Sequence, residues 1–461
     1  MEAQERSPER TAGSGGRFRW VICTLLFFSV AVNYIDRLTI GILKKPLSEQ
    51  LGWSETDYGY IAGAFSFAYA FGYLLGGRLM DRWGVRRGLM WIVFLWSLAA
   101  AGHGLVGLLD PHARWEVRVP WFSQAERGLA WLTLTVPFTV AGFVAARVLL
   151  GLAEGGNFPG AIKAVAEWFP VKERALATGL FNAGTNVGAV LCPVLVPWLY
   201  ARVGWQATFY LTGAAGFVWV AAWWWLYESP DKHPRLSEAE RRYIQEGRLA
   251  PEADPERVPW FSLLKYRAVW AYMIASILAG PAWGFYQFFL PDFLDKSFRL
   301  SLQEIGWWTG AFFAVAAVGG VVGGWLAGHW MSRGWSVNAA RKTALLACAL
   351  AVVPVVWAPS APNVVWAVLI VGLAGSAHQG WSANLFSVVS DTMPRQVVSS
   401  VVGLGGFVCY FTGGFVNGLT GWLLDRTGSY VLVFAYFSGM YLISLLAIQL
   451  LVPRIGKVAT A

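Results

Sequence analysis

The chain has 461 residues, of which 56% are hydrophobic and only 14% are charged. In a typical water-soluble protein about a quarter of the residues are charged, so the composition excludes an ordinary soluble enzyme or binding domain. The formal net charge is +9 at pH 7. Such a charge can attract nucleic acid, but nothing else in the chain supports a nucleic-acid partner.

Long stretches of the chain contain no Asp, Glu, Lys or Arg. They are 20–35, 58–77, 88–109, 128–146, 175–201, 203–227, 268–291, 305–332, 343–390, 396–424 and 427–453. A transmembrane helix needs about 20 mostly apolar residues. Because proline cannot continue a helix, Pro354, Pro359 and Pro362 divide the longest stretch into two spans. We therefore predict an all-α integral membrane protein with twelve transmembrane helices.

The distribution of Lys and Arg predicts the orientation in the membrane. With the N-terminus inside, 25 of the 36 Lys and Arg residues fall in cytoplasmic segments. Since cytoplasmic loops of membrane proteins are enriched in these residues, we expect both termini in the cytoplasm and the protein in the inner, or plasma, membrane of the cell. No cleavage site follows the first span, so we expect that span to be retained.

Motifs of catalysis and metal binding are missing from the sequence. Cys23, Cys192, Cys348 and Cys409 fall in four different predicted spans without the spacing of a metal site. We find no phosphate-binding loop and no nucleophile motif. The chain is therefore expected to be no enzyme, with no catalytic residue, no metal and no cofactor.

A charge-rich segment divides the chain into two sets of six spans. We expect an N-terminal six-helix bundle over 1–228, a cytoplasmic linker over 229–266 and a C-terminal six-helix bundle over 267–461. Within the linker, Ser237 and Glu240 have the spacing of a capping box. They predict a short, solvated surface helix, to which we assign no chemistry.

The two halves match each other when shifted. At an offset of 247, Ser54, Gly59, Gly63, Gly72 and Gly76 match Ser301, Gly306, Gly310, Gly319 and Gly323. At an offset of 224, Pro170, Gly179, Leu180 and Gly204 match Pro394, Gly403, Leu404 and Gly428. Two pseudo-symmetric bundles are typical of an alternating-access transporter with its site at the midplane between them.

A motif after the second span resembles the helix 2–3 loop signature of the major facilitator superfamily. Its residues are Gly77, Asp81, Arg82, Gly84, Arg86 and Arg87. The resemblance implies the two-bundle fold of that superfamily and a cytoplasmic gate in which Asp81 pairs with basic residues of neighbouring helices. The second half lacks the charge, because Gly328 stands where Asp81 stands in the first.

Further runs resemble the anion:cation symporter family of this superfamily. They are 33–37, 147–160, 167–170 and 233–237, and two segments, 154–186 and 378–386, are most similar to hexuronate transporters. The resemblance implies proton-coupled transport of a sugar acid. The long outer loop at 110–127 departs from the family pattern and leaves the precise substrate open.

Only four charged residues lie deep in the predicted spans: Asp36, Arg37, Arg147 and Glu154. A charge at the bilayer centre costs at least about 2.5–3.5 kcal/mol, so such residues face a cavity or each other. Neighbouring helical residues point about 100° apart, so Asp36 and Arg37 cannot share a partner. We expect Asp36 to pair with Arg147 while Arg37 and Tyr34 face a cavity. The alternative is an ion-paired quartet that only locks two helices together.

These four charges sum to zero. An anion that entered alone would leave a buried negative charge, which is expensive. If Glu154 or Asp36 first takes a proton, one carboxylate restores neutrality, so the charges predict proton–anion symport. The planar Arg37 guanidinium suits a carboxylate, and the family resemblance implies the same roles.

Polar and aromatic residues within the spans are candidates for contacts to the rest of the substrate. The candidates are Tyr34, Tyr69, Asn182, Gln287, His378, Trp381 and Asn384. Each alone is more often an interhelical contact than a ligand. The resemblance favours Tyr69, Gln287 and Trp381.

The leading prediction is a monomeric, proton-coupled importer of a hexuronate such as galacturonate or glucuronate. An aldonate of the galactonate type, or another organic anion, is the second choice. A phosphate-ester antiporter would need more than one cavity arginine, and an integral membrane enzyme would need a catalytic group that we do not find.

Overall fold

The computed structural model describes residues 17–123, 128–246, 260–393 and 395–456. Its first half contains α1 (Phe18–Ile42), α2 (Lys44–Leu51), α3 (Glu55–Leu105), η1 (Val106–Leu108), β1 (Arg114–Ser123), β2 (Gly128–Pro137), α4 (Phe138–Glu154), α5 (Asn157–Trp168) and α6 (Val171–Leu226). The linker contains α7 (Glu238–Glu246) and α8 (Trp260–Leu263). The second half contains α9 (Arg267–Ala279), α10 (Pro281–Phe288), α11 (Leu290–Phe298), α12 (Leu302–Ser332), α13 (Val337–Val352), η2 (Val353–Ser360), α14 (Val364–Thr392), α15 (Arg395–Thr427) and α16 (Val431–Leu451).

The helices account for twelve membrane crossings. Ten segments of the described chain are long and apolar enough to span a membrane. One of them, Leu176–Leu226, bends at Gly204 (φ 76°) and makes two crossings. The first part of α3, which ends at a similar bend at Gly84 (φ 74°), makes the twelfth. Only glycine adopts such a φ without strain. The predicted twelve-helix membrane fold is confirmed.

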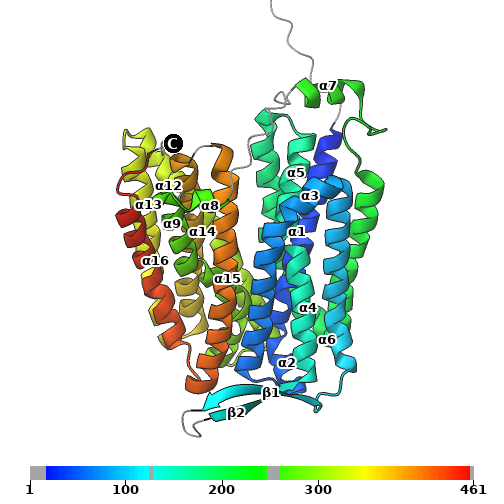
Figure 1. The fold of residues 1–461 in the computed structure, drawn as a ribbon, viewed down its shortest axis with the longest axis vertical. Helices are drawn as coiled ribbons and strands as arrows, with labels where there is room; N and C mark the ends of the chain where they lie inside the picture. The colour runs from blue at the N-terminus through cyan, green and yellow to red at the C-terminus, as the bar shows by residue number, and fades with distance from the viewer. Residues whose placement is uncertain (1–16, 124–127, 247–259, 394, 457–461) are drawn as a thin grey trace, which may run out of the picture.

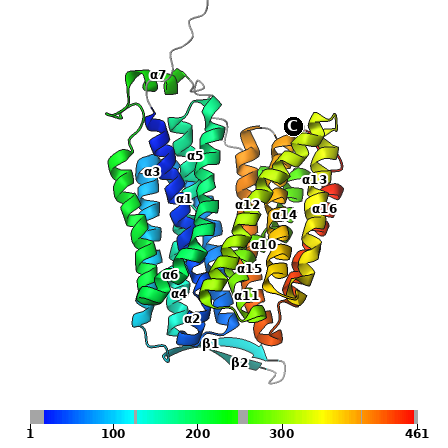
Figure 2. The same cartoon turned by 180° about the vertical axis from the view of Figure 1, so that it is seen from behind.

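The two halves lie side by side (Figures 1 and 2). Helices α1 to α6 form one bundle and α9 to α16 the other, and α15 lies against α3 where the bundles meet. One end of the molecule carries the hairpin of β1 and β2, and the opposite end carries α7. We call them the hairpin end and the linker end. The ribbons of the two bundles converge at the hairpin end and diverge at the linker end.

Glycine contacts show that the repeat found in the sequence is structural. A methyl group on Gly72 of α3 would lie 2.3 Å from the carbonyl oxygen of Leu152 in α4. A methyl group on Gly319 of α12 would lie 2.1 Å from the carbonyl oxygen of Ser376 in α14. These two pairs are related by the offsets of 247 and 224, so equivalent helices touch backbone to backbone in each bundle.

The start of the fourth crossing corrects one sequence prediction. The uncharged stretch 128–146 does not begin a membrane helix, because Gly128–Pro137 is strand β2, paired antiparallel with β1. Its run of Thr and Val residues favours a strand, and proline cannot sit inside a helix without losing a hydrogen bond. The crossing instead begins at Phe138 and continues through α4 and α5 to Trp168.

The predicted linker helix is present, but it is more than a solvated face. Ser237 Oγ accepts a hydrogen bond from the Glu240 amide (3.2 Å), which is one of the two hydrogen bonds of a capping box. The Glu240 carboxylate accepts the backbone amides of Phe18 and Arg19 (3.1 Å each) and pairs with the Arg19 guanidinium (3.0 Å). The linker helix therefore caps the start of α1.

The close approach of α3 to α4 predicts a specific sensitivity to added volume. Substituting Gly72→Ala forces a methyl group against backbone that cannot move aside, and overpacking costs about 1–3 kcal/mol. We expect a lower thermal unfolding midpoint for the purified protein in detergent. The control is Gly102→Ala in the same helix, where nothing lies within 4 Å of an added methyl group. Equal midpoints for the two variants would contradict the prediction.

Candidate functional site

A cavity of about 320 Å³ lies between the two bundles. One wall comes from α1, α3, α4, α5 and α6, and the other from α9, α10, α14 and α15. Eight of the residues proposed from the sequence line it: Tyr34, Arg37, Tyr69, Glu154, Asn182, Gln287, His378 and Trp381. Asp36, Arg147 and Asn384 do not line it.

An ion pair in the first bundle dominates the charge of the cavity. Arg37 Nε donates to Glu154 Oε2 (3.0 Å), and both side chains are almost fully buried. Arg37 Nη2 donates to Asn33 Oδ1 (2.9 Å). The guanidinium carbon lies 4.5 Å from the ring centre of Tyr69 and 4.9 Å from that of Tyr34, within cation–π range. Nη1 has no hydrogen-bond partner among the residues that the structure describes.

The expected pairing of the four charges was wrong. Within the described parts of the chain, no ion pair joins Asp36 to Arg147. Arg147 Nη2 instead donates to the backbone oxygen of Arg37 (3.1 Å), and Glu154 takes the Arg37 guanidinium. The angle of about 100° between Asp36 and Arg37 around α1 correctly excluded a common partner for the two side chains. It could not decide which of them forms the ion pair with α4.

Several polar atoms in the cavity walls lack partners among the described residues. They are Glu154 Oε1 and Asn33 Nδ2 in the first bundle, and Gln287 Nε2 and Trp381 Nε1 in the second. A buried polar atom without a hydrogen bond is costly. Carboxylate and hydroxyl groups of a bound molecule would satisfy all four atoms.

His378 and Asn384 have structural partners. His378 Nδ1 lies 2.5 Å from the Tyr441 hydroxyl, and its ring stacks on Trp283 with centroids 5.4 Å apart. Asn384 Nδ2 donates to the carbonyl of Gly323 in α12 (2.8 Å). Asn384 thus joins two helices of the second bundle away from the cavity, whereas His378 and Trp283 offer the cavity an aromatic surface.

The family model of the Major Facilitator Superfamily matches residues 26–418 of the chain. The chain belongs to this superfamily. The recognition made from the loop motif is confirmed.

Relatives within the superfamily are sugar-acid transporters. The hexuronate transporter of Escherichia coli K12 is 28% identical over 414 residues, which cover 89% of this chain and 88% of that protein. The galacturonate transporter of Dickeya chrysanthemi is 30% identical over 310 residues, which cover 67% and 81%. An Escherichia coli K12 protein named "Probable galactarate/D-glucarate transporter GudP" is 28% identical over 453 residues, which cover 95% and 94%.

Solved structures support the fold. The inward-open xylose transporter XylE of E. coli superposes with a TM-score of 0.70 at 14% identity and covers 94% of this chain and 96% of its own. A bacterial homologue of the lysosomal transporter Spinster gives a TM-score of 0.64 at 18% identity, with 95% and 96% covered. The predicted major facilitator fold is confirmed.

The superfamily's loop motif lies at the linker end, around the bend of α3. The side chain of Asp81 lies outside what the structure describes, so the expected pairing of Asp81 stays a prediction. Arg86 pairs with Glu228 just after α6 and donates to the Trp224 carbonyl (3.0 Å). Gly84 forms the bend itself, and the Arg82 and Arg87 side chains are exposed.

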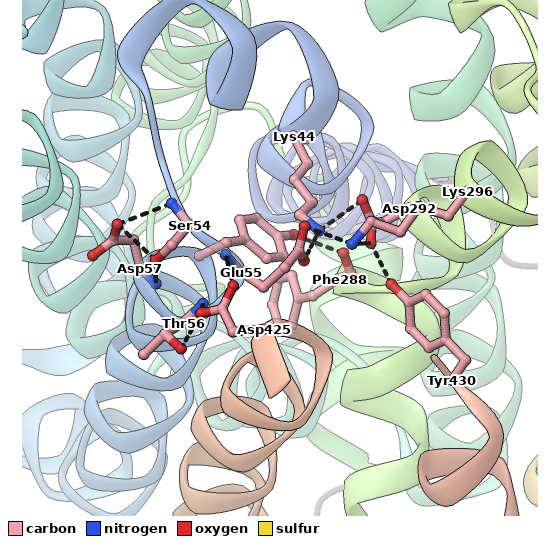
Figure 3. Close-up of polar contacts among 11 residues, drawn as sticks. Lys44, Ser54, Glu55, Thr56, Asp57, Phe288, Asp292, Lys296, Asp425 and Tyr430 are labelled. Atoms are coloured by element: carbon pink, nitrogen blue, oxygen red, sulfur yellow. Dashed lines mark hydrogen bonds and ion pairs between the residues drawn. The ribbon is translucent and has the colours of Figure 1, made fainter. Parts of the chain in front are cut away.

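A buried ionic network joins the two bundles of this major facilitator at the hairpin end (Figure 3). Lys44 of α2 pairs with Glu55 of α3 and, across the interface, with Asp292 of α11 (2.6 Å). Lys296 pairs with Glu55 (2.5 Å) and Asp292 (3.2 Å), and the Tyr430 hydroxyl donates to Asp292. We call these five residues the hairpin-end network. Sequence analysis missed it, because each member looked like an ordinary loop or helix-end charge.

Within this network, the ionised forms of Asp292 and Lys296 are favoured by their neighbours. Burial acts to raise the pKa of the Asp292 carboxyl, but Lys44 and Lys296 hold it below its usual range. Burial acts to lower the pKa of Lys296, but Asp292 and Glu55 raise it. Because the pKa of Asp292 is lowered, its contribution to the closed interface is present above the ordinary aspartate pKa of about 3.9. That contribution is lost only as the pH falls below this value.

Asp425 adds a second link between the bundles (Figure 3). Its carboxylate accepts the amides of Glu55 (3.0 Å) and Thr56 (2.7 Å) at the start of α3, and also the Thr56 hydroxyl. Ser54 and Asp57 form a capping box on the same helix end. The start of α3 is therefore capped by two carboxylates, Asp57 of its own bundle and Asp425 of the other, and the positive end of a helix favours such anions.

The pseudo-symmetric contact on the other side of the interface lacks this link. Gly59 of α3 lies against the carbonyl of Asn417 in α15, and its counterpart Gly306 of α12 lies against the carbonyl of Pro193 in α6. These are equivalent positions under the two repeat offsets. The residue that corresponds to the capping aspartate is Ala201. Among the residues that the structure describes, only the α3–α15 contact of this symmetric pair is held by a charged side chain.

Loss of the Asp425 cap is expected to favour opening of the hairpin end. Removing a helix cap costs about 0.5–2 kcal/mol, and in Asp425→Ala the whole loss falls on the closed interface. Native Cys409 lines the cavity, whereas Cys23, Cys192 and Cys348 are buried. We expect a membrane-impermeant thiol reagent on the hairpin side to label Cys409 about tenfold faster in this variant.

The matched control is Asp57→Ala, which removes the other carboxylate from the same helix end without touching the second bundle. We expect it to label at the wild-type rate. Faster labelling of both variants would assign the effect to fraying of α3 and not to the link between bundles.

Proposed function

We propose that the chain is a proton-coupled symporter that imports a sugar-acid anion, a hexuronate first, by alternating access. The single observation that carries this proposal is the buried Arg37–Glu154 pair in the wall of the interbundle cavity. Arg37 Nη1 and Glu154 Oε1 have no hydrogen-bond partner among the described residues. The relatives named for hexuronate and galacturonate support the substrate class.

The pair gives a physical reason for coupling. With Glu154 ionised, the Arg37 charge is already balanced, and a second carboxylate would add an unpaired buried charge. A proton on Glu154 Oε1, the oxygen without a partner, frees the charge of Arg37. A substrate carboxylate can then bind Arg37 through Nη1, and charge-assisted hydrogen bonds of this kind are among the strongest in proteins. Proton and anion therefore enter the site together.

The second bundle supplies contacts for the uncharged part of a sugar acid. Gln287 Nε2 and Trp381 Nε1 are unpaired donors on the wall opposite Arg37. The aromatic side chains of Trp283 and Tyr69 line the same cavity. A few placed polar groups within an otherwise apolar, aromatic pocket are typical of small-molecule sites.

The charge of the lining limits the substrate to one carboxylate. Among the described residues that line the cavity, Arg37 is the sole Arg or Lys. A uronate or an aldonate has one carboxylate, whereas galactarate has two and a phosphate ester has two negative charges. An aldonate remains the alternative substrate, and a relative named for L-galactonate supports it.

The orientation completes the proposal. The distribution of Lys and Arg puts α7 in the cytoplasm, so the hairpin end faces outward and the structure is closed on that side. We place the protein in the inner, or plasma, membrane as a monomer with both termini inside.

Glu154→Gln is expected to separate exchange from accumulation. The amide oxygen can still accept from Arg37, but the side chain no longer carries a proton. In proteoliposomes we expect galacturonate exchange at equal pH to persist, while accumulation driven by an inward proton gradient is lost. Glu49→Gln, an exposed position, is the control. Gradient-driven accumulation by Glu154→Gln with an unchanged pH dependence would reject the coupling role.

Competition by diacids tests the single-carboxylate site. We expect galactarate to inhibit galacturonate uptake at least about tenfold less well than unlabelled galacturonate, because its second carboxylate meets no cation. Gln287→Arg should narrow this difference by supplying one. Gln287→Met loses the donor without gaining charge and should leave the preference unchanged. Equal inhibition by both acids in the wild type would contradict the prediction.

A further inference from the structure

The first bundle contains a second group of buried polar atoms without partners, outside the cavity lining. Nε and Nη1 of Arg147 and Nε2 of His103 make no hydrogen bond with the described residues, and the two Asp36 oxygens make none of standard geometry although the Thr212 hydroxyl lies beside them. All three side chains are nearly inaccessible to solvent. Buried polar groups in proteins are nearly always hydrogen-bonded, so three such neighbours call for an explanation. Sequence analysis did not single out His103.

The contacts of His103 define its chemistry. Nδ1 lies 2.8 Å from the Ala99 carbonyl oxygen, which can only accept, so Nδ1 carries a hydrogen. In the neutral ring Nε2 is then a free lone pair. The ring stacks on Phe209 of α6 (centroids 5.1 Å apart) and meets the edge of Phe143 of α4 (5.5 Å). These apolar neighbours hold the ring in place and leave Nε2 as its one reactive atom.

Helix positions place His103 between the hairpin end and Asp36. His103 is two residues from the end of α3 at that side. Its neighbour Phe143 lies about 8 Å below the start of α4, and Arg147 lies about 14 Å below it. In α6, Phe209 and Thr212 lie about 8 Å and 12 Å below the bend at Gly204. His103 thus sits about one helical turn nearer the hairpin end than Arg147 and Thr212.

Asp36 does not line the cavity, although its neighbour Glu154 does. Its other neighbours are Arg147 of α4 and Thr212 and Cys192 of α6. The Thr212 hydroxyl donates to the Phe209 carbonyl (3.3 Å). Among the described residues, Arg147 is the charged group that bears on His103. A proton on His103 would lie near the positive charge of Arg147, which favours passing it on over keeping it.

We propose that His103 relays protons between the hairpin-end surface and Asp36, on a route through the first bundle that is separate from the substrate cavity. The proposal rests on the proposed proton-coupled function. A hydronium ion gives a proton to His103 Nε2, while Nδ1 keeps its own hydrogen and its hydrogen bond to the Ala99 carbonyl oxygen. The Nε2 proton then passes through a bridging water to an Asp36 oxygen, and the ring returns to its neutral form. Such a water would also accept a hydrogen bond from Arg147 and donate one to Asp36.

His103→Phe and His103→Gln test the relay. The first keeps the aromatic packing, and the second keeps a donor for Ala99, but neither side chain titrates. In proteoliposomes we expect galacturonate exchange at equal pH to stay within about twofold of wild type. Substrate-driven proton influx, followed with a trapped pH dye, should fall at least tenfold, because a positioned acid–base group contributes about 10²–10⁴-fold to proton transfer. His112→Gln, an exposed histidine on the same side, is the control and should behave as wild type.

Each other outcome rejects a distinct claim. Unchanged proton influx and pH dependence in both variants would reject the relay. Loss of exchange together with influx in both variants would reject it in favour of a packing role. A wild-type protein that exchanges galacturonate without moving protons would instead reject the proposed symport.

Discussion

The buried ion pair of Arg37 and Glu154 is the constraint on which the rest of the site depends. Two charges removed from water repay their desolvation only while they face each other, so neither can be released unless something replaces it. A proton can replace the arginine as partner of the glutamate, and a carboxylate can replace the glutamate as partner of the arginine. The aromatic rings of Tyr34 and Tyr69 lie against the guanidinium, and Gln287 Nε2 and Trp381 Nε1 on the opposite wall are neutral donors without a partner among the described residues. Under the proposed function, the cavity would select a single carboxylate because Arg37 is the one Arg or Lys among its described lining residues.

The two bundles are alike in backbone and unlike in chemistry. Gly59 and Gly306 bring equivalent helices into the same close contact, yet the seam of α3 with α15 also carries Asp425 and adjoins the hairpin-end network. The seam of α12 with α6 has Pro193 and Ala201 at the matching places. The repeat thus gives the two interbundle contacts the same backbone packing, whereas the Asp425 cap is present at only one of these two contacts within the described residues. The charges proposed to bind substrate and proton, Arg37 and Glu154, likewise lie in one bundle, and the other bundle offers neutral hydrogen-bonding groups to the cavity.

The sequence was sufficient for the fold and for the choice of charged residues, and insufficient for their partners. Scarcity of charge identified Arg37 and Glu154, because a charge in an apolar span has few explanations. The pairing of Asp36 was wrong because helical periodicity gives directions about one axis and not the rotation of one helix against another. Asp425 was missed because a carboxylate beside a loop is common, although its mismatch with Ala201 across the repeat was a readable signal. The strand at Gly128–Pro137 was missed because lack of charge alone does not distinguish a strand from a helix.

The ionised state of Asp292 and Lys296 has a consequence for how the closed face responds to its surroundings. Since these charges do not titrate near neutrality, a proton gradient that drives the proposed uptake would leave the contact between the bundles at the hairpin end unchanged. Because Lys44 and Asp292 are buried, dissolved ions screen their attraction much less than they screen the attraction between exposed charges. The contact between the bundles at the hairpin end would therefore persist over ranges of acidity and salt concentration that weaken a surface ion pair.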